Sequence, residues 1–214
     1  MGLWVPKLRA EYIIEGALYQ EALDYARRSR AYTSDRHDFH SGGLDNKQQK
    51  MLEGKLGEKA FKLFLQDNGI RFEEDHSSYE ERDEYDFLLQ GSGLRLRVDV
   101  KTRTEEFHIR TLELVEQTIS HPKELYVSAR LYRERNAVRL LGWFTREDLL
   151  TQGKIENQGY LDNYVMYDRQ LRPAAAHLHG FRHYGGGEVG AMLELIRHWL
   201  VGITCAAMLV ALAE

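Results

Sequence analysis

The chain has 214 residues, of which 43% are hydrophobic and 29% charged, a composition typical of a soluble globular protein. Its net charge of −4 excludes a basic field over the whole surface, so any nucleic-acid binding has to come from local basic patches. The single cysteine, Cys205, excludes an internal disulfide framework and a cysteine-based zinc site, and it fits a reducing cytoplasm.

The N-terminal part of the chain predicts two helices separated by a loop. Apolar residues recur at helical spacing through 7–32, so this segment is expected to be a helix. Residues 33–46 are rich in turn formers and predict a loop. A longer helix is expected over 46–69, where a stripe of apolar residues ends at Asn68-Gly69, a typical helix stop.

A run of strands follows the second helix. Residues 70–74 predict a short strand, and 86–102 predict a β-hairpin that turns at Gly-Ser-Gly. Residues 106–114 are expected to continue the same sheet, and two further strands are expected over 124–132 and 137–144. A helix, a hairpin and further strands in this order indicate an α+β domain around a mixed β-sheet.

The last third of the chain predicts a helix, an irregular region and an apolar helix. Thr145 followed by Asp148 is close to a capping box and predicts a helix N-terminus, whereas 155–185 is irregular. Residues 199–213 carry no charge but are shorter than the ~20 apolar residues of a membrane span. We therefore expect a buried or dimer-forming helix there, with a membrane anchor as the less favoured alternative. The expected organisation is an N-terminal helix and loop (1–44), a main domain (45–184) and a C-terminal apolar helix (185–214).

The predicted strand 94–101, with the sequence LRLRVDVK, has one apolar and one charged face. Side chains alternate sides along a strand, so the two faces are Leu94, Leu96, Val98, Val100 and Arg95, Arg97, Asp99, Lys101. Taken alone, such a charged face is usually a solvated surface. The tripeptide acidic-x-Lys also occurs at 45–47 and 53–55, so it carries little information without its context.

The context of Asp99 and Lys101 is what favours a site. Asp86 stands at the head of the partner strand of the hairpin, and the long helix before it carries Glu58, with Glu53 as a competing candidate. Asp86, Asp99 and the backbone carbonyl of Val100 are hard oxygen ligands of the kind that bind Mg²⁺ or Mn²⁺. Lys101 would stabilise a phosphate and orient a nucleophilic water, and Glu58 would reach the metal directly or through water.

In their order and on these elements, Glu58, Asp86 and Asp99-Val100-Lys101 resemble the PD-(D/E)xK nuclease superfamily, which includes type II restriction enzymes and archaeal Holliday-junction resolvases. The resemblance extends over residues 45–150 and departs from the motif at Tyr85, where the motif's name has proline. It implies a restriction-endonuclease-like core, a central mixed β-sheet flanked by helices, here with N- and C-terminal helical extensions. It also implies Mg²⁺- or Mn²⁺-dependent hydrolysis of DNA phosphodiester bonds, most simply by an endonuclease.

The expected partners follow from this reading. Arginines near the predicted site are candidates for contact with DNA phosphates. They are Arg95, Arg97, Arg103, Arg172 and Arg182. A homodimer is expected, because two sites cut two strands most simply, and no membrane association is expected. The alternative function is a non-catalytic nucleic-acid-binding or scaffold protein that retains the same fold.

Overall fold

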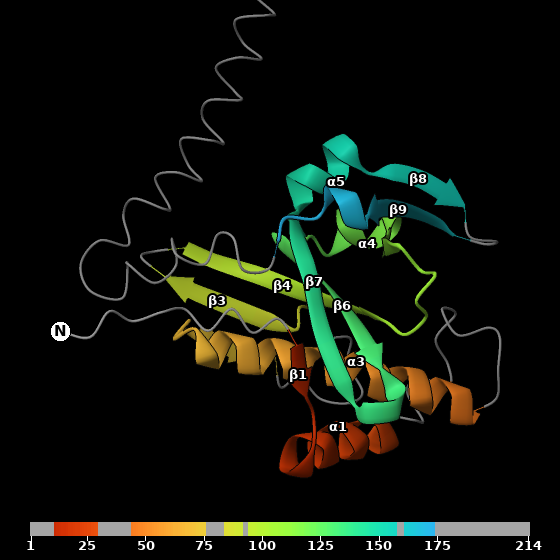
Figure 1. Cartoon of the computed structure of the whole chain (residues 1–214). Helices are drawn as coiled ribbons and strands as arrows, with labels where there is room; N and C mark the ends of the chain where they lie inside the picture. Colours follow the sequence, from red (N-terminus) through yellow and green to blue (C-terminus); the bar gives the residue numbers. More distant parts are fainter. Residues whose placement is uncertain (1–10, 30–43, 76–83, 92–93, 158–160, 174–214) are drawn as a thin grey trace, which may run out of the picture.

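A computed structural model describes residues 11–29, 44–75, 84–91, 94–157 and 161–173. It contains a six-stranded mixed sheet with helices on one face and a smaller three-stranded sheet beyond the other (Figure 1). This arrangement confirms the predicted α+β class, a mixed β-sheet flanked by helices. The predicted C-terminal helix and Arg182 lie outside the described residues.

The large sheet contains the predicted hairpin. Its strands, in spatial order, are β1 (Glu11–Ile13), β7 (Ala137–Thr145), β6 (Leu125–Tyr132), β4 (Leu94–Arg103), β3 (Phe87–Gly91) and β2 (Phe72–Glu74). β4 and β6 pair in parallel, and the other neighbours pair antiparallel. The hairpin of β3 and β4 runs from the pair Gly91–Leu94 to the pair Phe87–Val98, as the alternating sequence predicts.

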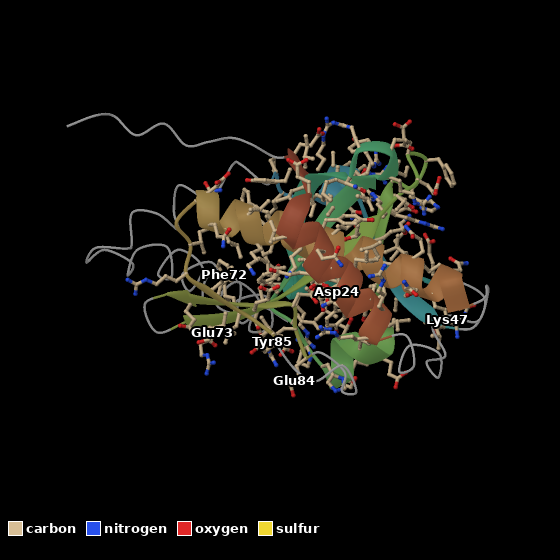
Figure 2. The ribbon with its side chains drawn as sticks, turned by 90° about the horizontal axis from the view of Figure 1, so that it is seen from below. Asp24, Lys47, Phe72, Glu73, Glu84 and Tyr85 are labelled. Atoms are coloured by element: carbon tan, nitrogen blue, oxygen red, sulfur yellow. The ribbon has the colours of Figure 1, made fainter. Side chains whose placement is uncertain are left out.

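Two helices cover one face of this sheet. α3 (Leu44–Asp67) packs against β4, and α1 (Gly16–Arg28) packs against α3. Seen from the helical side, Lys47 of α3 and Phe72 of β2 lie at opposite sides of the molecule (Figure 2). The core between helix and sheet includes Phe61, whose ring lies 5.3 Å from that of Phe87 in an edge-to-face arrangement. α3 ends as predicted, because Gly69 adopts φ +62, which favours glycine.

The second layer packs on the opposite face of the large sheet. Its strands, in spatial order, are β5 (Arg110–Leu114), β9 (Asp162–Tyr167) and β8 (Lys154–Asn157). Three short helical segments accompany them: α4 (Val115–Ser120), α5 (Arg146–Gln152) and η3 (Asp168–Gln170). A fourth, η2 (Arg133–Arg135), connects β6 and β7 of the large sheet. A second hydrophobic core forms here from Tyr126, Phe144, Leu149 and Met166, with the rings of Tyr126 and Phe144 stacked at 5.1 Å. Thr145 is the N-cap of α5 and forms the predicted capping box with Asp148.

The structure corrects three predictions of secondary structure. Residues 11–13 form a strand at the edge of the large sheet and not the start of a helix, because Tyr12 is buried while Ile13 is 50% exposed, a period of two. The segment 106–114 does not continue the large sheet, since β5 pairs with β9 of the small one. The region 155–185, expected to be irregular, contains most of β8 and all of β9, which pair with each other. Long-range pairing, which local periodicity does not report, decides all three.

Candidate active site

Strand β4 has one apolar and one charged face, as its alternating sequence predicts, and the two faces point into different layers of the protein. Val98 and Val100 are 0% and 7% exposed and belong to the core beneath α3. Asp99 and Lys101 face the opposite way, and their ammonium–carboxylate distance is 2.7 Å. They do not face open solvent, because the side chain of Asp99 is only 14% exposed. The charged face of this strand is therefore partly enclosed by the small sheet.

Asp86 lies beside Asp99 at the point where β3 begins. Its backbone N–H donates to the Val98 carbonyl at 2.9 Å, and its Oδ2 accepts a 2.6 Å hydrogen bond from the backbone N–H of Val100. The N–H and C=O of one residue in a strand point toward the same edge, so the Val100 carbonyl also points toward the Asp86 side. The carboxylates of Asp86 and Asp99 and the carbonyl of Val100 are thus close to one another at the end of the hairpin opposite its turn.

Glu58 reaches this corner because α3 lies very close to β4. A Cβ atom at Gly57 would stand 1.8 Å from Thr102 Oγ1, so only glycine permits this approach of helix and strand. Glu58 is 8% exposed, and its Oε2 lies 2.8 Å from Lys55 Nζ. Glu53, the competing candidate, instead accepts a 2.7 Å hydrogen bond from Arg133 Nε.

The electrostatics tie these carboxylates together. Burial, followed by the negative charges of Glu58 and Asp99, raises the pKa of Asp86 well above its usual value, although Lys55 and the Val100 N–H oppose this. For Asp99, burial disfavours the charged form, but Lys101 and Lys123 outweigh it and lower the pKa. The ionised form of Asp86 is therefore the one most disfavoured by the neighbouring negative charges, and a bound cation would reduce that repulsion.

Sequence reasoning missed two members of this cluster, Glu113 and Lys123. The Lys101 ammonium lies 2.7 Å from Glu113 Oε2, and Lys123 Nζ lies 3.7 Å from Asp99 and 3.8 Å from Glu113. Both side chains are almost fully buried, at 1% exposure for Glu113 and 4% for Lys123. The alternation of Thr111, Leu112 and Glu113 identifies a strand but not its neighbour, so the sequence held no signal for this contact.

The candidate DNA-contacting arginines differ in how far they are committed to other partners. Arg95 is the most exposed, with 70% of its side chain accessible and Glu73 at 3.9 Å. Arg97 binds both oxygens of Glu124, and Arg103 pairs with Asp168 while its side chain is only 9% exposed. Arg172 donates to Asp148 at 2.8 Å and lies over the Trp143 ring. Of the four that the structure describes, Arg95 is therefore the most exposed and the least engaged by other side chains.

The donors present fit a hard divalent cation as a set of two carboxylates and a carbonyl. Within the described ranges, no group of three or more His, Cys, Asp or Glu side chains is arranged to hold a metal ion. Glu58 therefore does not complete a three-carboxylate cluster with Asp86 and Asp99. Asp99 Oδ2 is buried with the Lys101 ammonium at 2.7 Å, and because the two oxygens of a carboxylate offer about four lone-pair sites, this contact leaves room for a cation. Oxygen donors of this type suit Mg²⁺ or Mn²⁺.

Comparisons with known proteins add little to this geometry. No family model matches the chain, and no curated protein matches it. One solved structure that does match is that of a bacterial homing endonuclease, with a TM-score of 0.36 and 15% identity over 72% of this chain and 96% of that one. A likeness of this degree establishes neither a shared family nor a shared activity. Across the described residues, no helix has the length and apolar character that crossing a membrane requires.

Proposed function

We propose that the chain is a metal-dependent nuclease that hydrolyses phosphodiester bonds of DNA, acting as an endonuclease. The observation that carries the proposal is that Asp86, Asp99 and Lys101 lie together at the end of the β3–β4 hairpin opposite its turn. The negative charge of Glu58, on α3, acts on Asp86 at the same place. These residues come from α3, from the position just before β3 and from β4, and Glu58 and Lys101 are 43 positions apart in the sequence. A merely solvated strand face would not require a buried, mutually repelling pair of carboxylates.

Each residue has a distinct role in this proposal. Asp86, Asp99 and the Val100 carbonyl would hold Mg²⁺ or Mn²⁺, which supplies Lewis-acid polarisation of the scissile phosphate when bound. Lys101 places a positive charge beside Asp99, where it neutralises charge that develops on a phosphate oxygen and orients the attacking water. Glu58 acts through water on the same donors, and Arg95 contacts the DNA backbone.

The decisive experiment is incubation of the purified full chain with supercoiled, linear, single-stranded and branched DNA, with and without Mg²⁺. We expect Mg²⁺-dependent nicking or cutting that Asp99→Asn and Lys101→Ala each lower by at least about 100-fold while the fold persists. Glu11→Gln is the matched control and keeps activity, because Glu11 is on the edge strand β1 of the same sheet and pairs with Arg135 and Arg139, which have no role in the proposed site. Cleavage by either site variant at the wild-type rate contradicts the proposal. DNA binding without any cleavage would instead support the non-catalytic alternative.

We also propose that the chain works as a homodimer, because cutting both strands is simplest with two sites. Light scattering of the full chain should give twice the monomer mass. Deleting residues 187–214, which lie outside the described residues, should give aggregation or a monomer that nicks one strand. A deletion variant that stays dimeric and fully active would overturn this assignment of the C-terminal segment.

A further inference from the structure

The charged face of β4 carries a buried ionic tetrad, and one of its two carboxylates comes from the small sheet. Asp99 and Lys101 belong to β4, Glu113 belongs to β5 of the small sheet, and Lys123 precedes β6. Glu113 contacts Lys101 at 2.7 Å, and Lys123 lies between Asp99 and Glu113 at 3.7 and 3.8 Å. The tetrad therefore has two carboxylates and two ammonium groups with no excess charge.

Stability alone is a weak explanation for a carboxylate at this position. The side chain of Glu113 is 1% exposed, and its oxygens contact the ammonium groups of Lys101 at 2.7 Å and Lys123 at 3.8 Å. Removing such a charge from water costs several kcal/mol, and an apolar pair of similar volume is often at least as stable. Because a buried carboxylate is unfavourable for stability, its presence at this position favours a functional role that requires its negative charge.

Contacts between the two sheets fix where Glu113 stands relative to β4. Its strand neighbour Thr111 makes a 2.8 Å hydroxyl–hydroxyl hydrogen bond with Ser128 of β6, which joins the two sheets. Glu113 itself pairs with Tyr164 in the ladder between β5 and β9. Ser128 in turn pairs with Lys101 in the parallel ladder of β4 and β6. Contacts with both sheets thus hold the Glu113 carboxylate next to Lys101.

We infer that Glu113 is the positioning residue that holds the Lys101 ammonium in the site while Asp99 serves as a metal ligand. The inference rests on the proposed function. Lys101 has two carboxylate partners, and its side chain remains 29% exposed, so the ammonium sits at the boundary between the buried tetrad and solvent. With Asp99 bound to a cation, Glu113 would be the carboxylate that keeps the Lys101 ammonium from turning into solvent. The small sheet thereby becomes part of the catalytic apparatus.

The test compares Glu113→Gln with Glu156→Gln in the full chain. Glu156 is the matched control, because it is in the same small sheet and pairs with Arg110 at 2.6 Å without belonging to the tetrad. The first measurement is a lysine-selective NMR spectrum, in which a held ammonium group gives an observable signal, assigned to Lys101 by its absence in Lys101→Met. We expect this signal to be lost or shifted in Glu113→Gln and kept in Glu156→Gln.

The second measurement is cleavage kinetics together with Mn²⁺ calorimetry. We expect kcat of Glu113→Gln to fall about 100-fold with KM for DNA and Mn²⁺ affinity unchanged, since a displaced catalytic group costs about that much. Loss of Mn²⁺ binding would make Glu113 a ligand and overturn the positioning role, as would an unchanged Lys101 signal or an unchanged kcat. If Glu113→Gln does not fold, Glu113→Asp keeps the charge but shortens the reach, and a folded Glu113→Asp with wild-type kcat also overturns the inference. A wild-type protein that cuts no DNA refutes the proposed function, whereas the NMR comparison still decides whether Glu113 holds Lys101.

Discussion

Replacing Gly57 with alanine tests the contact that brings α3 to the site. The added Cβ would lie 1.8 Å from Thr102 Oγ1, 3.1 Å from Thr102 Cβ and 3.3 Å from Thr102 Cγ2. Rotating the threonine about χ1 does not clear the clash, because its Cβ and methyl group are also close. The helix therefore has to move away from β4, and Glu58, the next residue, moves with it.

The expected magnitude follows from two opposing effects. Overpacking a well-packed contact costs roughly 1–3 kcal/mol, and so short a contact belongs at the upper end. Alanine regains about 1 kcal/mol over glycine in a helix interior. We expect Gly57→Ala to lower the free energy of unfolding by about 2 kcal/mol, which corresponds to a Tm about 4–8 °C lower for a chain of this size.

The same helix supplies the control. A Cβ at Gly54 meets nothing within 4 Å, so Gly54→Ala should gain about 1 kcal/mol from helix propensity and raise the Tm. Urea unfolding followed by circular dichroism measures both variants. Adding Thr102→Ala to Gly57→Ala removes the oxygen and the methyl group and should restore most of the loss. Equal stability of Gly57→Ala and Gly54→Ala would refute the close packing of α3 on β4.

Three further predictions concern the core, the helix cap and the metal donors. Val98→Asp places an unpaired charge at a fully buried position and should prevent folding, so soluble protein with a cooperative unfolding transition would contradict the face assignment of β4. Asp148→Asn should cost about 1–2 kcal/mol at neutral pH. Burial opposes the ionisation of Asp148, but hydrogen bonds from Arg172 and Thr145 outweigh it and lower its pKa; the stabilisation is therefore full above the ordinary carboxyl pKa of about 4 and is lost as pH falls through the lower folded value. The Tm difference between wild type and Asp148→Asn should shrink on acidification, and a difference that grows there would show the sign to be wrong. Asp86→Asn combined with Asp99→Asn should abolish Mn²⁺ binding in calorimetry, and retained affinity would exclude a shared metal seat.

The local pattern of the sequence determined the elements around the site. The alternation in 94–101 was sufficient to predict a strand with Asp99 and Lys101 on one face, because a period of two has a single structural meaning over eight residues. The long helix carrying Glu58, its end at Gly69 and the capping box of Thr145 also depend on neighbours in sequence, so they were readable before any fold was known.

Only the tertiary structure decided how these elements meet. The sequence left Glu53 and Glu58 as competitors, and the approach of α3 to β4 at Gly57 is what couples Glu58 to Asp86. It held no sign of Glu113, because pairing β5 with β9 and stacking that sheet over β4 are long-range events. Short strands such as β1, β5 and β8 are stabilised by pairing with other strands, and a local sequence pattern does not show which strand each of them pairs with. The charged face of β4 was visible in the sequence, whereas its enclosure by a second sheet was not.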